Sequence, residues 1–393
     1  MESTRRNFLK LAGTAALAAS ATPLLSACRG IVRVDLKGTG SDAEGPLLGP
    51  GLSDILYHAS LAPSGHNTQP WTVTVHTPDR LVIGSDKGRW LPGVDPENRE
   101  MLLSIGAFLE YLIIAANHQG YDIQYRVIAQ TAFDQDIIEV TLAAAAPQPG
   151  TKDPIPRRRT VRNGYTAKEI SAADTATLSR PFGGDLLFIP RQSRQGRYLK
   201  DGTVEANRLQ AYRESAQEEL ARWIRWTDED ARRERNGLTP EGMEITGIAG
   251  WYVRHFMDRQ TVLTKKFREQ TVDIVKKQVN QGGGWLVIAS RDSAIPTLIE
   301  TGRKFGRMLL ELRPRMIAVH PMTQMLEEAP LRDGVARDLG IEGTVQFILR
   351  TGYLTTYPEP VSLRMPISRF VSLNSTGGLR SDPNERNVQV IRG

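Results

Sequence analysis

The stretch Ala62-Pro63-Ser64-Gly65-His66-Asn67-Thr68-Gln69-Pro70-Trp71 follows a predicted short helix at 53–60 and precedes a predicted strand. A compact loop of this composition can present hydroxyl, amide and backbone groups to the edge of a planar heteroaromatic ring, while Pro63 packs against the ring face. The same residues can equally form a structural turn, in which Asn67 caps backbone groups and Trp71 belongs to the core. The residue types alone leave both interpretations open.

The residues after this loop predict a first structured segment at 51–145. Apolar and polar residues alternate at 73–75, a Thr-Pro-Asp turn follows and 81–83 is again apolar, which predicts a hairpin. Asp95-Pro96 is typical of a helix start and Gly120 of a helix end. Apolar residues between them cover more than one face, so we expect this helix to be buried between two layers. Two strand-like runs, 123–128 and 137–142, complete the segment.

A proline-rich stretch, 143–156, leads into a second segment at 155–372. Its charged part, about 200–280, predicts a helical insertion with Leu220, Trp223 and Ile224 on one face. A solvated helical hairpin packed by that face and a lid over a pocket are both compatible with this pattern. A strand, a helix, another strand and a polar tail are then expected at 285–289, 297–312, 345–349 and 373–393.

The N-terminus has the layout of an export signal. Thr4-Arg5-Arg6-Asn7-Phe8-Leu9-Lys10 precedes a stretch rich in alanine and leucine, and resembles the twin-arginine signal, so we expect a signal peptide at 1–27. The alternative, a membrane anchor, needs ~20 apolar residues, more than this stretch offers before Pro23 interrupts it. Leu25-Ser26-Ala27-Cys28 further resembles a bacterial lipobox with a lipidated cysteine, although Cys28 can also be an incidental neighbour of an ordinary cleavage site.

The signal carries expectations about location and cofactor. The twin-arginine pathway resembled here exports folded proteins, which implies a tightly bound cofactor and a periplasmic or cell-envelope location. Contact with the membrane is expected only through a lipid anchor at Cys28, since acyl chains anchor stably without a spanning helix. The glycine-, aspartate- and proline-containing stretch at 28–50 is expected to be a tether.

Composition excludes several classes of function. The 393 residues include 50 basic and 44 acidic ones, a net charge of +6, and this basic excess is too small and dispersed to predict nucleic-acid binding. One cysteine excludes an internal disulfide framework or an all-cysteine metal site. The six histidines show no metal-ligand spacing, so no metal is expected. The motifs of serine hydrolases, phosphate-loop enzymes and Rossmann dehydrogenases are absent from the sequence.

The loop resembles the hallmark of the nitroreductase family of flavoproteins, Pro-Ser-x-x-Asn-x-Gln-Pro-Trp. In that family the loop crosses a dimer interface and touches an FMN ring held mainly by the other subunit. The resemblance therefore implies flavin contacts by Pro63, Ser64 and Asn67, with Gln69 and Trp71 supporting the loop.

Two further matches concern the FMN phosphate, which the family binds through arginine and lysine side chains. Arg158-Arg159-Thr160-Val161-Arg162 and Arg364 match these motifs, which implies phosphate binding by Arg158, Thr160, Arg162 and Arg364. By itself the arginine run at 157–162 is also typical of a solvated basic turn. The family presents backbone amides to flavin N5, and the corresponding position implies the N–H groups of Met322 or Thr323; His320 is expected to be a structural turn residue.

The motifs divide between the two segments, because the first has the ring-contacting loop and the second has both phosphate motifs. This division resembles the tandem Acg-like branch of the family, in which one chain imitates the dimer. We therefore expect an α+β, nitroreductase-like fold of two fused halves, an intrachain pseudo-dimer with a helical insertion and one FMN. The long apolar helices at 97–117 and 301–313 are candidates for its counterpart helices. The oligomeric state stays open.

The resemblance implies an FMN-dependent oxidoreductase that passes hydride or electron pairs from NAD(P)H or a quinol to a small electron-poor acceptor. No catalytic side chain is required, because the flavin carries the chemistry. A flavin-binding protein with little turnover, which stores or sequesters FMN, is the alternative. A lipoprotein scaffold with an empty relic site is a third interpretation.

Overall fold

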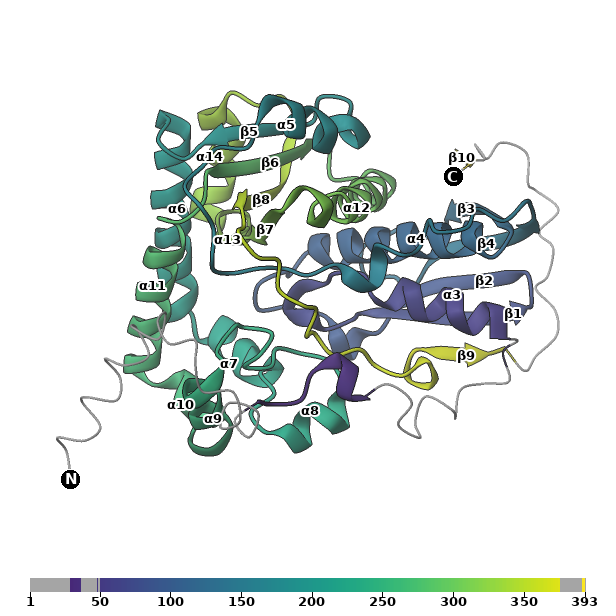
Figure 1. The fold of residues 1–393 in the computed structure, drawn as a ribbon, viewed down its shortest axis with the longest axis horizontal. Coiled ribbons are helices and arrows are strands. Elements are labelled where there is room, and N and C mark those ends of the chain that lie inside the picture. The colour runs from purple at the N-terminus through teal and green to yellow at the C-terminus, as the bar shows by residue number, and fades with distance from the viewer. Residues whose placement is uncertain (1–28, 37–47, 49, 375–390, 393) are drawn as a thin grey trace.

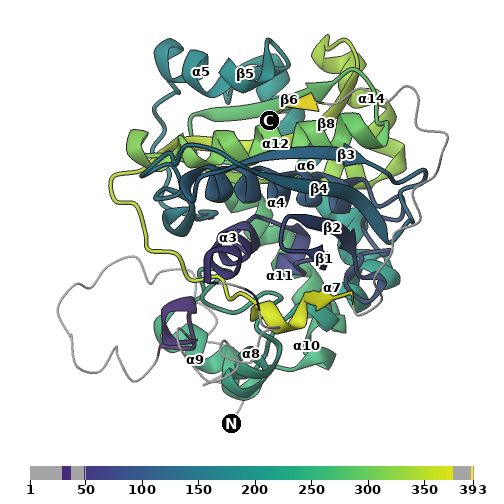
Figure 2. The ribbon, with the colours of Figure 1, turned by 90° about the vertical axis from the view of Figure 1, so that its right-hand side faces the viewer.

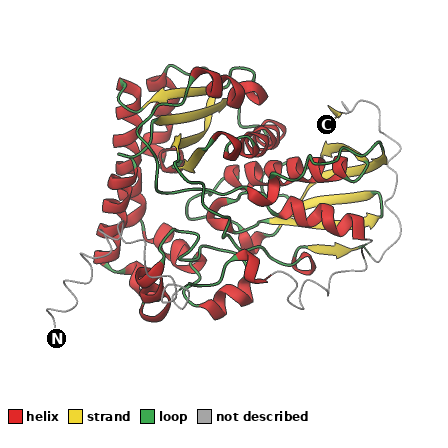
Figure 3. Cartoon of the chain, in the orientation of Figure 1, coloured by secondary structure: helices red, strands yellow, loops and turns green. Residues whose placement is uncertain are grey.

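The computed structural model describes residues 29–36, 48, 50–374 and 391–392. The predicted signal, Cys28, most of the predicted tether and the tail residues 375–390 lie outside the described residues. The described chain is α+β, which confirms the predicted class: a six-stranded and a four-stranded sheet are connected through helices (Figures 1 and 3).

The six-stranded sheet contains the predicted hairpin and the two strands expected after it. In spatial order its strands are β10 (Ile391–Arg392), β3 (Tyr121–Val127), β4 (Asp136–Ala144), β2 (Arg80–Ser85), β1 (Trp71–Thr77) and β9 (Val371–Leu373). β9 is parallel to β1, with Val371 opposite Val73. The segment that follows β8 crosses the molecule to reach this edge (Figure 1), so a late part of the chain lies beside the loop that precedes β1.

The four-stranded sheet belongs to the second half and is antiparallel throughout. Its strands, in spatial order, are β5 (Leu186–Pro190), β6 (Gly284–Ser290), β8 (Thr344–Tyr353) and β7 (Ile317–Pro321). β6 is buried along its whole length, as a strand covered on both faces requires. The predicted strands at 285–289 and 345–349 are therefore confirmed.

Helix α4 (Arg99–His118) is the buried helix that the sequence predicts. It is long and apolar enough to cross a membrane, but 89% of its apolar window is buried inside the protein, as in the core helix of a folded domain. Its predicted start at Asp95-Pro96 is wrong, because Asn98 adopts left-handed φ and α4 begins at Arg99. Asp95 still accepts a hydrogen bond from the N–H of Met101 at 2.9 Å, so it caps the helix from outside the first turn.

Helices α4 and α12 (Ile295–Leu310) lie side by side where the two halves meet (Figures 1 and 2). A Cβ atom added to Gly106 of α4 would come within 2.1 Å of the carbonyl oxygen of Ile299 in α12. A Cβ added to Gly302 would come within 2.1 Å of the carbonyl oxygen of Leu103. The contact is reciprocal, since each glycine faces the backbone three residues before the other, and only glycine permits this approach.

The remaining helices form a peripheral layer and an insertion. The insertion contains α6 (Arg194–Tyr212), α7 (Glu214–Trp223), α8 (Asp228–Glu234), α9 (Gly247–Phe256), α10 (Arg259–Leu263) and α11 (Lys265–Gln278). It is therefore several helices rather than a single hairpin. The other helices are α3 (Pro50–Ser60), α5 (Ala172–Ser179), α13 (Gln324–Glu327) and α14 (Ala329–Leu339).

Short 3₁₀ turns connect these elements: η1 (Arg33–Leu36), η3 (Gly65–Asn67), η4 (Lys87–Arg89), η5 (Ile155–Arg157), η6 (Arg180–Phe182), η7 (Arg313–Arg315) and η8 (Ile367–Arg369). η1 falls within the segment predicted as a tether, yet it packs against the insertion and the C-terminal segment. Leu36 of η1 lies in a small apolar cluster with Ala231 and Leu363.

Candidate functional site

The loop between α3 and β1 is held in an unusual backbone conformation. His66, Asn67 and Gln69 all have left-handed φ angles, of 46°, 54° and 53°. Such angles are uncommon outside glycine, and they persist where surrounding contacts impose them, often at functional sites. One contact is internal, because the hydroxyl of Ser64 accepts a hydrogen bond from the N–H of Gln69 at 3.0 Å. Trp71 ends the loop, fully buried beside Phe108.

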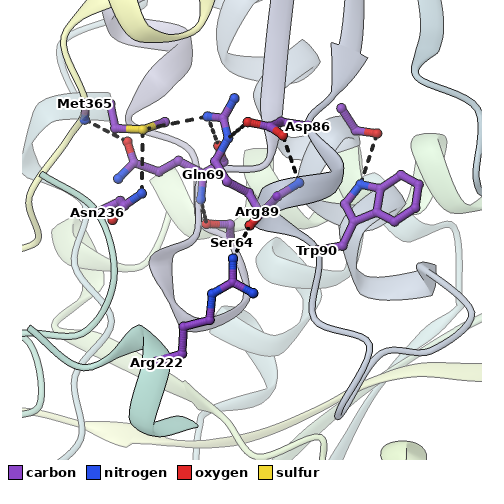
Figure 4. A network of polar contacts seen from close by, with 10 residues as sticks. Ser64, Gln69, Asp86, Arg89, Trp90, Arg222, Asn236 and Met365 are labelled. Carbon is purple, nitrogen blue, oxygen red and sulfur yellow. Dashed lines mark hydrogen bonds and ion pairs between the residues drawn. The ribbon is translucent and has the colours of Figure 1, made fainter. Parts of the chain in front are cut away.

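Gln69 connects the loop to two distant segments, and Figure 4 shows its bonds to Met365 and Arg89. Its side-chain amide donates to the carbonyl of Arg235 in the insertion at 3.1 Å, and its Oε1 accepts from the N–H of Met365 at 2.9 Å. Its own carbonyl accepts from Arg89, which also pairs with Asp86. Gln69 is fully buried, so these bonds hold the loop rather than face a ligand.

Asn67, which is expected to touch the flavin, also makes several contacts within the protein. Its Nδ2 donates to the carbonyls of Gly237 and Leu363 at 3.1 and 3.2 Å. Its Oδ1 accepts from Nη1 of Arg364 at 2.9 Å. Its carbonyl also accepts from the N–H of Gly237 at 2.9 Å. Asn67 therefore joins the loop, the insertion and the C-terminal segment.

Arg158 and Arg364 meet at the start of this loop. Nη2 of Arg158 and Nη2 of Arg364 both donate to the carbonyl oxygen of Leu61, at 3.2 and 3.1 Å. Arg364 also donates to the carbonyl of Ala62 at 3.1 Å and is only 5% exposed. The structure thus brings together two predicted phosphate ligands, from 158 and 364, with the loop that begins near residue 61.

The charges of these two guanidinium groups are poorly compensated. In the described part of the chain, the hydrogen bonds of Arg158 and Arg364 all end on neutral carbonyl or amide oxygens. Burial, with the charges of Arg158 and Arg33 nearby, lowers the pKa of Arg364 well below its ordinary value. Removing charge from water without a counter-charge is costly, so this arrangement favours a bound anion.

The charge of Arg162 acts on two histidines, one of which, His66, lies in the loop. Burial, reinforced by the charge of Arg162, lowers the pKa of His66 to about 4 and that of His320 well below its ordinary value. The N–H of Arg162 donates to Oε1 of Glu244, in the insertion, at 3.0 Å. Among the recorded contacts, Arg158 shares an acceptor with Arg364, whereas Arg162 acts on His66 of the loop. Thr160, between them, is half-buried.

The two predicted N–H donors, Met322 and Thr323, differ in their contacts within the protein. The N–H of Met322 donates to the carbonyl of Ile348 at 2.8 Å, so it is engaged within the protein. Thr323 remains the candidate, and its hydroxyl donates to Glu327 at 3.1 Å. Burial, with Glu100 nearby, raises the pKa of Glu327 well above its ordinary value, which favours its protonated form.

Unsatisfied polar atoms indicate that the region suits a polar ligand. Buried polar atoms without a partner are costly and normally meet water or a ligand. Those of the loop and its arginines without a protein partner among the described residues include Arg158 Nε, Arg364 Nε and His66 Nδ1. FMN carries a phosphate for guanidinium donors and a ring with donors and acceptors on its edge, so the residues present fit this cofactor.

Two proteins of similar sequence carry names that agree with the resemblance of the loop to the nitroreductase motif. No family model matches the chain. PigM of Serratia sp. (strain ATCC 39006), provisionally named an NAD(P)H nitroreductase, is 24% identical over 77% of this chain and 88% of its own length. The chain is similar to nitroreductases. Rv3131 of Mycobacterium tuberculosis (strain ATCC 25618 / H37Rv), also provisionally named an NAD(P)H nitroreductase, is 24% identical over 81% of this chain and 90% of its own length.

Sequence reasoning missed several residues of this nitroreductase-like site. Gly237 and Glu244 lie in a charged insertion whose pattern, compatible with a solvated hairpin or a lid, singles out neither residue, and Arg33 lies in the predicted tether. His66 occupies an unspecified position of the loop motif, so the motif assigns it no role. Each of these contacts joins segments far apart in the chain, which local patterns do not reveal.

Proposed function

We propose that the chain is an FMN-dependent oxidoreductase of the nitroreductase type, with FMN bound between the two halves. The observation that carries this proposal is the convergence of Arg158 and Arg364 on Leu61, at the start of the nitroreductase-like loop. The similarity to two proteins named NAD(P)H nitroreductases supports the reaction class and a nicotinamide reductant, with a quinol as the alternative donor. A small electron-poor molecule, such as a quinone or nitroaromatic, is the acceptor.

When bound, FMN supplies reversible transfer of hydride or electrons, and the protein supplies binding and electrostatics. Arg158 and Arg364 hold the phosphate, because a guanidinium fork suits a phosphate dianion. Arg162 places a positive charge near His66, where it stabilises negative charge on a reduced ligand. Thr323 is the candidate N–H donor to the ring. Pro63 and Ser64, both half-buried, are the candidate ring contacts of the loop.

The two halves act as an intrachain pseudo-dimer with one composite site. Two observations support this part of the proposal. The glycines of α4 and α12 make a reciprocal contact, as expected for helices related by an approximate twofold axis. The loop comes from one half, while Arg158 and Arg364 come from the other. Each half would supply what the other lacks.

Export completes the proposal. The sequence pattern at 1–28 supports translocation of the folded, FMN-loaded protein by the twin-arginine pathway, followed by lipidation at Cys28 in the cell envelope. Replacement of Arg5 and Arg6 by lysine should leave the protein in the cytoplasm, and Cys28→Ala should release it from the membrane fraction. A membrane-bound Cys28→Ala protein would contradict the lipid anchor.

A second function, storage of FMN with little turnover, is favoured by the position of the insertion. Gly237 bonds to Asn67 in both directions, and Glu244 accepts from the backbone of Arg162, so the insertion closes over residues assigned to the site. A closed site hinders the approach of a reductant and an acceptor. This second function predicts bound flavin that NAD(P)H and quinols reduce only slowly.

The deciding experiment mixes purified yellow protein with NAD(P)H or a quinol and follows flavin absorbance anaerobically. A quinone or nitroaromatic is then added. Reduction followed by rapid reoxidation, repeated over many cycles, supports the oxidoreductase. Photoreduced flavin that no acceptor reoxidises supports storage instead, and protein that binds no FMN in any state contradicts both.

A further inference from the structure

Residues 29–36 are fixed at the edge of the proposed site. The N–H of Gly30 donates to Glu241 of the insertion at 2.9 Å, and the N–H of Arg33 donates to the carbonyl of Val361 at 3.2 Å. Arg235 donates to the carbonyl of Leu36 at 3.1 Å. This segment, which we call the N-terminal strap, therefore joins the insertion to the chain just before Arg364.

The strap places Arg33 in a cavity of about 270 Å³. Arg364, Tyr57 and Met365 also line this cavity. Asp54 lines it too, but its carboxylate already contacts Lys152 and accepts from Gln119 at 2.7 Å. The cavity is small for an entire cofactor but large enough for a phosphate group, since whole-ligand pockets begin at about 300 Å³.

The guanidinium groups of Arg33, Arg158 and Arg364 act on one another here, and that of Arg235 also lines the cavity. Nη2 of Arg33 donates to the carbonyl of Pro156, close in the chain to Arg158. Burial lowers the pKa of Arg33, and the charge of Arg158 lowers it further. Arg158 and Arg33 likewise lower the pKa of Arg364. Glu359 raises the pKa of Arg33 but is itself largely exposed and paired with Arg313 at 2.5 Å.

The arrangement is therefore short of negative charge. Two of these cations, Arg158 and Arg364, have no carboxylate among their recorded partners in the described chain, and each has a buried Nε without a partner. A phosphate monoester, which carries close to two negative charges near neutral pH, would compensate several of these cations at once.

We propose that Arg33 is a phosphate-binding residue and that the N-terminal strap closes the phosphate end of the flavin site. This inference rests on the proposed function and adds a third arginine, from outside both nitroreductase-like halves, to Arg158 and Arg364. It makes the site selective for FMN over riboflavin, which has the same ring but lacks the phosphate. It also couples cofactor retention to the segment that follows the export signal.

The alternative role for Arg33 is structural, because its bond to Pro156 could simply fasten the strap. Two variants separate the roles. Arg33→Gln keeps a side-chain donor for that carbonyl but loses the charge, whereas Arg33→Lys keeps the charge and loses the guanidinium fork. Arg29→Gln is the matched control, since Arg29 lies in the same strap, is exposed and pairs with Asp35 at 2.5 Å.

The test measures the dissociation constants of FMN and riboflavin by flavin fluorescence, on full-length protein stripped of flavin and reloaded. Arg33→Gln should raise the dissociation constant of FMN by about 10- to 100-fold, the loss expected for one hydrogen bond to a charged group. Binding of riboflavin should not change. Arg33→Lys should lose less affinity for FMN than Arg33→Gln, and Arg29→Gln should match the wild type.

Four results would overturn the inference. Unchanged FMN binding in Arg33→Gln, or equal weakening of FMN and riboflavin, would leave Arg33 with a structural role only. Wild-type protein that binds FMN no better than riboflavin would refute the phosphate site, although the protein would still be a flavoprotein. Wild-type protein that binds neither flavin would refute the proposed function itself. Thermal unfolding without flavin checks the fold, and Arg33→Lys provides a second measurement if Arg33→Gln fails to fold.

Discussion

Replacement of Gly106 by alanine tests the contact on which the arrangement of the two halves depends. The added Cβ would lie 2.1 Å from the carbonyl oxygen of Ile299 and 3.0 Å from Cα of Gly302. Carbon and carbonyl oxygen normally approach no closer than ~3.3 Å, so the first distance is short by about 1.2 Å. Both obstacles are helix backbone, which cannot rotate away, so α4 and α12 must move apart.

The expected magnitude combines two opposing effects. Overpacking of a tight core costs about 1–3 kcal/mol, and a clash with backbone on both sides belongs at the upper end. Alanine in a helix interior is favoured over glycine by about 1 kcal/mol. The free energy of unfolding should therefore fall by about 2 kcal/mol in Gly106→Ala.

The matched control is Gly334→Ala in α14. Its Cβ would meet only the ends of flexible side chains, at 3.2 Å from Arg337 and 3.3 Å from Asp338. This variant should gain up to about 1 kcal/mol from helix propensity. Urea unfolding followed by far-UV circular dichroism should therefore separate the two variants by about 3 kcal/mol.

The reciprocal contact also predicts the stability of the double variant Gly106→Ala/Gly302→Ala. Once Gly106→Ala has separated the helices, Gly302→Ala should cost less than it does alone, because one displacement relieves both clashes. Flavin retention should also fall in Gly106→Ala, since the site takes residues from both sides of this contact. A Gly106→Ala protein as stable as Gly334→Ala would refute the reasoning.

Three further predictions concern single side chains. Because the pKa of His66 is lowered to about 4, the unfolded chain binds more protons than the folded chain between about pH 6.5 and 4. Lowering the pH through this range should therefore reduce the free energy of unfolding by about 2–3 kcal/mol, and this contribution should be absent in His66→Asn. Urea midpoints that are equal in both proteins across this range would contradict the prediction. Glu110 is buried and accepts a hydrogen bond from Arg303 at 3.1 Å. Glu110→Gln should therefore lower the free energy of unfolding, measured with urea, by about 3 kcal/mol. A loss below about 1 kcal/mol would count against a structural ion pair. Glu244→Gln weakens the hydrogen bond that the N–H of Arg162 donates to Glu244, so FMN release should become several-fold faster in a dilution assay. An unchanged release rate would show that the insertion does not retain the flavin.

Much of the fold was predictable because it follows from local patterns. The β1–β2 hairpin, α4, β6, α12 and β8 all appear where alternation or helical periodicity places them, since burial imposes the same periods that the sequence shows. The start of α4 did not, because Asp95 caps the helix from a turn that contains a left-handed Asn98. Propensity alone does not register that turn.

The candidate site was predictable only where a motif exists. The motif singled out the loop, Arg158 and Arg364, which the structure brings together. It did not anticipate that the amide of Asn67 would be used by Gly237 and Arg364, or that the N–H of Met322 would be bonded to β8. Nor did it find Arg33, whose position depends on contacts with the insertion. These features arise from tertiary contacts between segments whose local sequences are unremarkable in composition.

The central claim is that the two halves share one FMN, with its phosphate held by Arg158 and Arg364 of the second half. Its most direct test is the amount of flavin released per chain from purified wild type, Arg158→Ala/Arg364→Ala and the exposed control Arg291→Ala. We predict close to one FMN per chain in the wild type and the control, and none in the double variant. A folded double variant that keeps its full complement of FMN would contradict the account.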